Sequence, residues 1–530
     1  MAVSKSSKNS PSFKKRSKAA APKSQLGILA PLAVFIALSA LSCAAVVFFY
    51  TRGYLTWDND AQAHINTARR VVDSLTPGYE QLGTTWLPLP HVMMMPLARI
   101  DSLFQSGLAG AIPSAIFFVL CGTALFAATR RILGSGEAAI AATALIALNP
   151  NLLYMQSLAM TEAIYLGTFC GMFYFMVLFV DTQSIGAVVG AGICSLAGCM
   201  TRYDGWFLIP FITLFFLVAA RENRLLVAFT FGAIASSGCV YWMAHNYYFY
   251  SDPLYFYRGE WSAKAIQARS HSSYPGHGDW PLAFLYYRSA ALACAGTTLF
   301  WMGAAGVVFA FFKRAWWAVL LLVLPGVFYV MNVHSGDSPI FLPQLWYGSY
   351  YNTRYGLAML PLFAFGSACI VAMMPQGVRK MVGTVVILVG VSPWLAYPRM
   401  ENWVCWKESQ VNSETRRAWT DQAASYLRAN YRPGDRILTS FSDLTNIYRQ
   451  AGIPFRQTVN ECNGLIFEAR LKKPEIFLDE NWVVAISGDP VSQAMAKAHF
   501  GRYSYQCVKM VEVKGAAPIE IFRRFRKTNP

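Results

Sequence analysis

Charged residues are scarce in this chain. Asp, Glu, Lys and Arg make up 14% of its 530 residues, whereas a soluble domain carries roughly 25%. Hydrophobic residues make up 55%, and several apolar runs reach the roughly 20 residues that a helix needs to cross a bilayer. This composition excludes a soluble globular protein. Because lipid cannot satisfy backbone hydrogen bonds, we expect a polytopic α-helical membrane protein.

Long apolar runs predict eleven transmembrane helices along the chain. We expect them at about 26–50, 108–128, 136–153, 159–180, 185–200, 205–220, 225–248, 289–312, 315–333, 354–374 and 380–398. The segments 136–153 and 185–200 are short for a crossing. The stretch LPLPHVMMMPLARI at 87–100 is shorter still and rich in proline. It predicts an interfacial or re-entrant helix.

Acidic residues are absent from the first 25 positions, which carry seven Lys and Arg residues. Such a basic tail is typical of the cytoplasmic side, so we expect residues 1–25 to be a disordered cytoplasmic tail. Most of the expected inside turns also carry bases, namely Arg130/Arg131, Arg221/Arg224, Lys313/Arg314 and Arg379/Lys380, and only the turn near Asp181 lacks one. An odd number of spans then places residues 400–530 outside an inner (plasma) membrane. The net charge of +17 partly reflects this topology and anionic lipid headgroups, and it does not indicate nucleic-acid binding.

Cysteines are few outside the apolar runs. Eight of the eleven lie within expected spans, where a free thiol behaves as a small hydrophobe. Cys405, Cys462 and Cys507 remain in the outer part, where they allow at most one disulfide, and the compartment stays unsettled. From about 400 onward, helix, turn and strand patterns alternate, which predicts a small extracytoplasmic α/β domain over 400–530. That domain has no Gly-rich phosphate loop and no metal-spaced Cys/His set.

Ionisable residues gather in the expected outer loops. The loop at 51–107 begins TWDNDAQAHINTARR, and later outer junctions carry Glu162 and Arg202. Arg354 stands at the membrane edge of a later span. Ionisable side chains at membrane depth cost a few kcal/mol each, so they tend to be functional. A carboxylate can take a proton from a hydroxyl nucleophile, and Arg suits a phosphate leaving group. The carboxylate candidates are Asp58, Asp60 and Glu162, and the phosphate candidates are Arg202 and Arg354.

Five stretches follow one another in the chain, namely DNDAQAHINTARRVVDSLTPGYEQLGTTWLPLPH, MTEA, TRYDGW, NYYFYSDPLYF and TRYGLAMLPL. In this order they resemble motifs of the GT-C superfamily of integral membrane glycosyltransferases. They are similar to the lipid-phosphate-sugar transferases that include protein mannosyltransferases and the aminoarabinose transferase. The resemblance covers roughly residues 30–400, so it implies one GT-C-like catalytic module over 26–399.

The resemblance also implies roles for particular residues. Taking Ala68 and Arg69 as the anchor places the reactive aspartate of the family on Asp60, with Asp58 as the near alternative. The second acid falls on Glu162. Arg354 and Arg202 would face the donor phosphate. His64, His91, Tyr355 and Asp204 are candidate acceptor or sugar contacts, and a divalent metal, Mg²⁺ or Mn²⁺, stays open.

Two features depart from the family pattern. Asn59 splits the usual adjacent acidic pair, and the outer domain lacks the WWD-type motif of oligosaccharyltransferases. Simpler interpretations also exist for the same residues. Asp58 and Asp60 could cap the following helix, and Glu162 could form a structural salt bridge with Arg202. His64 could be a satisfied surface histidine.

The sequence therefore predicts an inverting transferase that moves a sugar from a polyprenyl-phosphate donor to an acceptor on the outer side. Its partners would be that lipid-linked sugar, membrane lipid and an unidentified glycan, lipid or protein acceptor. A lipid-diphosphate-linked oligosaccharide transferase is a second hypothesis. A secondary transporter or a non-catalytic scaffold belongs to a different class, although ionisable residues at one rim and the lack of a repeat are not typical of a transporter.

Overall fold

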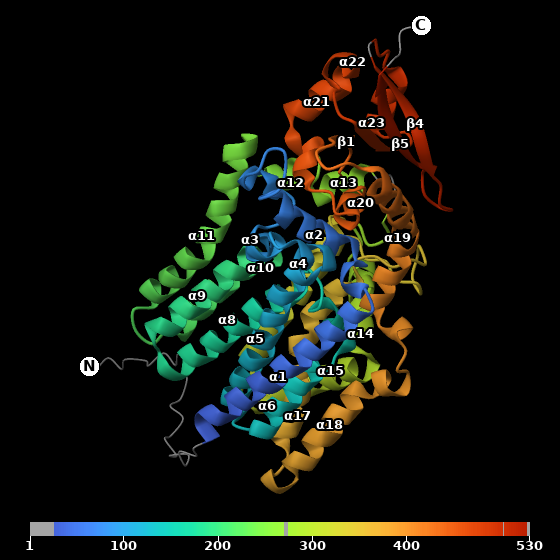
Figure 1. Cartoon of the computed structure of the whole chain (residues 1–530). Helices are drawn as coiled ribbons and strands as arrows, with labels where there is room; N and C mark the ends of the chain where they lie inside the picture. Colours follow the sequence, from blue (N-terminus) through green and yellow to red (C-terminus); the bar gives the residue numbers. More distant parts are fainter. Residues whose placement is uncertain (1–25, 270–273, 442, 502, 527–530) are drawn as a thin grey trace, which may run out of the picture.

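The computed structural model describes residues 26–269, 274–441, 443–501 and 503–526. Figure 1 shows a bundle of long helices with a small sheet above one end of it. The predicted basic tail at 1–25 lies outside the described residues. Within the described residues, seven helical segments are long and apolar enough to cross a membrane, and an eighth forms if one bent pair counts as one span. The chain is a multi-pass membrane protein.

The long apolar segments form most of the bundle. They are α1 (Leu26–Thr51), α5 (Leu108–Leu133), α8 (Glu162–Thr182), α11 (Arg224–Tyr250), α16 (Trp316–Ser335), η3 with α17 (Thr353–Met359 and Leu360–Met373) and α18 (Gln376–Ala396). The bent pair is α14 (Trp280–Ala295) and α15 (Thr297–Phe312), with an angle of 111° between the two helices. Shorter apolar helices are α3 (Leu89–Ala98), α6 (Gly136–Ala147), α9 (Ile185–Cys199) and α10 (Asp204–Ala219).

Every expected span contains a helix, but the number eleven is not confirmed. The run at 136–153 divides at Asn149, whose side chain caps the short helix α7 (Pro150–Met155). Pro150 cannot donate a backbone hydrogen bond, so a new helix starts there. The run at 289–312 breaks at Gly296, where φ is +80°, a backbone conformation that favours glycine. The short helix expected within 87–100 is α3.

The region after the last span is mixed α/β. Its helices are α19 (Val404–Asn430), α20 (Thr445–Ala451), α21 (Leu465–Lys472), α22 (Pro474–Phe477) and α23 (Pro490–Lys497). Its strands are β1 (Ile437–Thr439), β2 (Thr458–Val459), β3 (Trp482–Ile486), β4 (Tyr503–Val511) and β5 (Ile519–Arg526). They form one sheet in the order β2-β1-β3-β5-β4. β1 pairs in parallel with β2 and β3, whereas β5 is antiparallel to β3 and β4.

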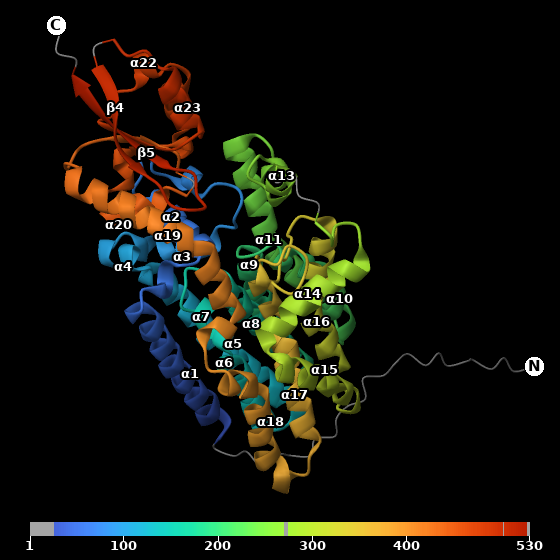
Figure 2. The same ribbon diagram turned by 90° about the vertical axis from the view of Figure 1, so that its right-hand side faces the viewer.

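Residues 51–107, which the sequence predicts as the first outer loop, lie between the bundle and this sheet. They form the helices α2 (Asn59–Arg70), α3 and α4 (Asp101–Ser106), which lie below the C-terminal sheet in both views (Figures 1 and 2). α19 runs from the bundle toward the sheet (Figure 2) and contacts both α7 and α2. Trp406 of α19 packs against Tyr54 and Trp57 at the end of α1, with ring centroids 5.8 and 5.9 Å apart. The C-terminal region is therefore packed onto the membrane part through its first helix.

Candidate active site

A cavity of about 470 Å³ opens beside α2 and the ends of several apolar helices. Its lining comes from segments far apart in the chain, with Asp60 and His64 from α2, Glu162 from α8 and Arg354 from η3. Arg202, between α9 and α10, and Asp204, the first residue of α10, also line it. The outer-loop residues singled out by the sequence therefore meet around one space.

Asp58 caps the N-terminus of α2. Its Oδ1 accepts hydrogen bonds from the backbone N–H groups of Asp60 (2.9 Å) and Ala61 (3.2 Å). Its Oδ2 accepts a hydrogen bond from Ser409 Oγ of α19, at 2.9 Å. Burial raises the pKa of Asp58, although Arg354 opposes that shift. Asp58 is 6% exposed and is not among the described residues that line the cavity, so its position is that of a helix cap.

Asp60 points toward the cavity from the first turn of α2. Its side chain is 34% exposed, and its Oδ2 forms an ion pair with Arg354 Nη2. Within the described residues, no hydrogen bond to its Oδ1 is found. Asp60 thus combines a held carboxylate oxygen with a second oxygen that is free to receive a hydroxyl proton. That combination distinguishes it from the buried, fully bonded Asp58.

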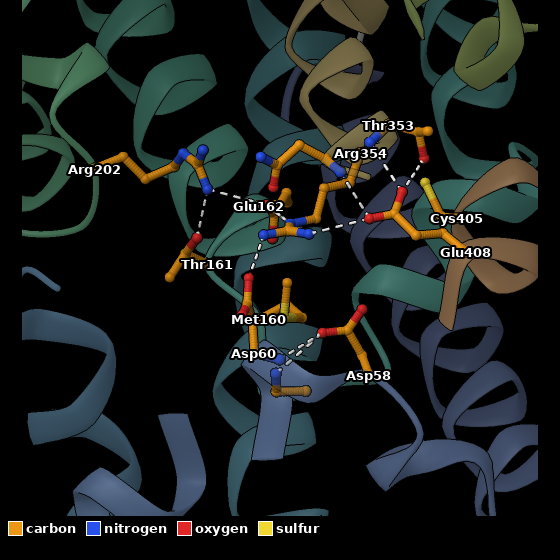
Figure 3. Close-up of polar contacts among 12 residues, drawn as sticks. Asp58, Asp60, Met160, Thr161, Glu162, Arg202, Thr353, Arg354, Cys405 and Glu408 are labelled. Carbon is orange, nitrogen blue, oxygen red and sulfur yellow. Dashed lines mark hydrogen bonds and ion pairs between the residues drawn. The ribbon is translucent and has the colours of Figure 1, made fainter. Parts of the chain in front are cut away.

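Arg354 lies at the centre of the charged network (Figure 3). Besides Asp60, its Nε lies 3.1 Å from Glu162 Oε1 and its Nη1 lies 3.5 Å from Glu408 Oε1. Figure 3 shows its guanidinium between these three carboxylates. They come from α2, α8 and α19, so one arginine joins the outer loop, the membrane bundle and the C-terminal region.

Glu408 holds the segment that carries Arg354. Its carboxylate accepts hydrogen bonds from the backbone N–H groups of Asn352 (2.8 Å) and Thr353 (2.9 Å), and also from the Thr353 hydroxyl. Burial raises the pKa of Glu408, although the nearby Arg354 partly opposes that shift. Sequence reasoning missed this residue. The available signal was its spacing of four and three residues after Val404 and Cys405, which places a carboxylate on the buried face of α19.

Arg202 forms the second half of the network. Its Nη1 donates to Thr161 Oγ1 (2.6 Å) and lies 3.0 Å from Glu162 Oε1. Its Nη2 donates to the Tyr329 hydroxyl at 2.7 Å, and that hydroxyl donates to Asp204 Oδ2 at 3.1 Å. The Glu162–Arg202 salt bridge that the sequence allowed is therefore present, and Glu162 bridges the two arginines.

Tyr355 lines the cavity beneath both guanidinium groups. The centre of its ring lies 5.1 Å from the guanidinium carbon of Arg202 and 5.3 Å from that of Arg354. It also stacks on Tyr329, with ring centroids 4.9 Å apart. Both Tyr355 and Asp204, which were predicted as sugar or acceptor contacts, lie on the cavity wall. Aromatic faces of this kind attract the two cations and help to fix their direction.

The two predicted histidines form a buried pair, and only His64 lines the cavity. His64 Nδ1 and His91 Nε2 are 2.8 Å apart, and the Trp86 ring lies 4.3 Å from that of His64. Burial, together with the nearby positive charges of Arg354 and Arg202, lowers the pKa of His64 to about 3. His91 is fully buried and is not among the described residues that line the cavity. The structure therefore does not place His91 where it could contact a ligand in the cavity. Its ring is buried and lies against His64.

A divalent metal finds no ready set of ligands here. Within the described ranges, no group of three His, Cys, Asp or Glu side chains is arranged to hold a metal ion. Of the carboxylates that line the cavity, Asp60, Glu162 and Asp204 are each engaged by an arginine, and Asp337 accepts a hydrogen bond from Ser335. The residues do not fit the Mg²⁺ or Mn²⁺ that the sequence left open.

Comparison with known proteins gives a family match for part of the chain and structural matches for most of it. Residues 97–243 match the family model described as dolichyl-phosphate-mannose-protein mannosyltransferase. No curated protein matches the chain by sequence. Among solved structures, ArnT from Cupriavidus metallidurans bound to undecaprenyl phosphate has a TM-score of 0.55 at 12% identity, with 91% of this chain and 97% of that chain covered.

Two archaeal structures are also similar. The apo oligosaccharyltransferase from Archaeoglobus fulgidus has a TM-score of 0.51 at 12% identity, over 88% of this chain and 70% of that chain. AglB from the same organism, in complex with an inhibitory peptide and a dolichol-phosphate, has a TM-score of 0.50 at 13% identity, over 87% and 70%. The structural likeness shows the GT-C fold, and the family match gives the class of enzyme, a membrane glycosyltransferase.

Proposed function

We propose that this membrane glycosyltransferase of the GT-C superfamily moves a sugar from a polyprenyl-phosphate-linked donor to an acceptor hydroxyl on the outer side of the membrane. The observation that carries the proposal is the position of Asp60, which lines the cavity with one oxygen paired to Arg354. The lipid carrier is suggested by similar proteins, since ArnT was solved with undecaprenyl phosphate and AglB with a dolichol-phosphate. Apolar side chains, including Phe256 and Phe328, line the same cavity and would suit such a lipid.

In the proposed reaction, Asp60 acts as a general base. The acceptor hydroxyl gives its proton to the Asp60 carboxylate while its oxygen attacks the anomeric carbon of the sugar. The bond from that carbon to the phosphate oxygen breaks, and its electron pair leaves with the polyprenyl phosphate. Attack from the face opposite the phosphate inverts the anomeric centre. No step uses a metal ion.

The charged network would hold this geometry through the reaction. Arg354 fixes Asp60, and Glu162 fixes Arg354 and Arg202 relative to each other. Both guanidinium groups line the cavity and would present N–H groups to the phosphate as negative charge develops on it. Asp58 caps α2 and would act only by positioning Asp60.

The proposal also fixes an orientation for the chain. We place the N-terminal tail in the cytoplasm and the cavity on the extracytoplasmic side of an inner membrane. Residues 26–399 then form the catalytic module and residues 400–530 form an outer α/β domain. This assignment rests on the basic residues of the expected inside turns.

Replacing the two aspartates by asparagine tests the proposal. We expect Asp60→Asn to lower the release of sugar from a labelled polyprenyl-phosphate-sugar by at least about 100-fold, as loss of a general base does. Asp58→Asn is the matched control, because asparagine caps a helix about as well as aspartate. It should reduce turnover only a few-fold. Unchanged turnover in both variants would rule out the mechanism, and a large loss in Asp58→Asn alone would assign the base to Asp58.

A further inference from the structure

Carboxylates outnumber guanidinium groups in the charged network. Asp58, Asp60, Glu162, Asp204 and Glu408 lie in or beside it, and two arginines face them. Each guanidinium is shared among carboxylates, since Arg354 contacts three of them and Arg202 contacts two. The positive charge of both arginines is therefore already offset by the protein itself.

A lipid phosphate would add further negative charge to this place. Bringing an anion to a site that is already rich in carboxylates is unfavourable unless another cation accompanies it. The arginines can still donate hydrogen bonds, but they supply no net positive charge. The cation has to come from elsewhere on the wall of the cavity.

Lys264 is the cavity-lining residue that meets this need. It lies on α13 (Ala263–Arg269), in the loop above the bundle, and its side chain is exposed. Within the described ranges, its ammonium nitrogen has no carboxylate at ion-pair distance. The nitrogen instead lies over the Tyr257 ring, 5.3 Å from the centre of that ring. An ammonium group without a carboxylate partner is a ready point charge for a phosphate.

The surroundings of Lys264 suit a phosphate that carries a lipid chain. Phe256 and Ile266, from the same loop, line the cavity together with Phe328 of α16. Ile266 is 45% exposed and lies two residues after Lys264. An ammonium group next to apolar side chains at a cavity mouth matches a molecule with an anionic head and an apolar tail.

We propose that Lys264 binds the phosphate of the polyprenyl donor and provides the positive charge that Arg354 and Arg202 cannot. This inference rests on the proposed function and deepens it. It adds to the assignment made from the sequence: the two arginines hold the carboxylates and still offer N–H groups to the phosphate, while Lys264 supplies the net positive charge. The phosphate chemistry would be the same for a lipid headgroup and for free phosphate, so the test has to separate the two.

Binding of polyprenyl phosphate to the purified full-length protein tests this inference without knowledge of the sugar or the acceptor. We expect Lys264→Gln to weaken binding by about tenfold, in line with the loss of one charged hydrogen bond, and Lys264→Arg to restore most of it. Arg269→Gln is the control on the same helix. Its guanidinium donates to Glu260 O at 2.6 Å and lies over the Trp261 ring, and it does not line the cavity. That variant should bind as the wild type does.

Uncharged polyprenol and inorganic phosphate complete the comparison. Lys264→Gln should leave the weak binding of polyprenol unchanged, and added salt should weaken phosphate binding more in the wild type than in this variant. If inorganic phosphate competes with polyprenyl phosphate for the wild type but not for Lys264→Gln, the phosphate head alone is recognised. If inorganic phosphate does not compete for the wild type, the lipid chain is also needed for binding. Either result supports the site.

Equal losses in Lys264→Gln and Arg269→Gln would overturn the inference, because they would indicate a general surface charge effect. Unchanged binding in Lys264→Gln would also overturn it. The proposed function fails separately, if the wild type itself binds no polyprenyl phosphate.

Discussion

At the residue scale, Glu408 shows why a site cannot be read from loop motifs alone. It approaches Arg354 across 54 positions of sequence, from a helix outside the expected catalytic module. A buried carboxylate is unfavourable unless hydrogen bonds and a cation compensate it. Glu408 has two backbone N–H donors, one hydroxyl donor and Arg354. Because these partners include the backbone N–H groups of Asn352 and Thr353, Glu408 fixes the backbone of 352–354.

Glu408→Gln should therefore impair the site. Glutamine keeps the shape of the side chain but loses the charge that faces Arg354, and its NH₂ group would oppose one of the donors that glutamate accepts. We expect sugar transfer to fall by about tenfold or more, the cost of one charged hydrogen bond, with the amount of folded protein retained in detergent. Glu414→Gln, at an exposed position of the same helix, is the control. Equal activity of the two variants would contradict a positioning role.

Whether each of the remaining site residues could be predicted depends on whether its neighbours in the sequence indicated its place. Asp60, Glu162, Arg202 and Arg354 were predictable, because each is an ionisable residue beside an apolar run, and the structure brings all four together. Ser409 was not predictable, since its bond to Asp58 spans 351 positions of sequence. The pairing of His64 with His91 could not be predicted from the sequence either, because a long connection separates α2 from α3.

At the scale of elements, helix packing was less predictable than helix position. The apolar runs indicated where the helices lie in the sequence. How closely two helices pack in the bundle depends on small residues at their contact. Gly303 and Gly306 of α15 face Gly366 of α17 with backbones in contact. A Cβ on Gly366 would come within 2.2 Å of Gly303 O, and one on Gly306 within 2.0 Å of Gly366 O. These glycines let α17 lie close to α15, and α17 continues directly from the segment that carries Arg354.

Gly366→Ala should disturb this packing. The added methyl group meets backbone atoms, which cannot move aside as a flexible side chain could, and overpacking of this kind costs about 1–3 kcal/mol. We expect a lower thermal midpoint in detergent and reduced transfer activity. Gly377→Ala is the matched control, because a Cβ there meets nothing within 4 Å. If both variants unfold at the wild-type temperature, the close approach of α15 and α17 does not contribute to stability.

At the scale of the whole molecule, the first outer loop and the C-terminal sheet region are joined by several polar contacts. Arg456 Nη1 lies 3.0 Å from Asp73 Oδ1, and Arg449 Nη1 donates to Gln105 O at 2.7 Å. Gln81 Nε2 donates to Cys462 O at 2.9 Å. Because the loop also supplies Asp60, the sheet region and the cavity must face the same side of the membrane. The side of the membrane on which the sheet lies therefore shows on which side the reaction takes place.

The thiol of Cys507 reports that side. Cys507 is exposed on β4, whereas the exposed Cys43 belongs to the apolar helix α1, where surrounding lipid would shield it from a polar reagent. A membrane-impermeant maleimide should label the protein in sealed right-side-out vesicles and leave it unlabelled in inside-out vesicles. Cys507→Ser should remove most of the label, which assigns the signal to this position. Labelling restricted to inside-out vesicles would place the sheet region, and with it Asp60 and the cavity, in the cytoplasm, because the polar contacts to the first outer loop do not allow the two to lie on opposite sides.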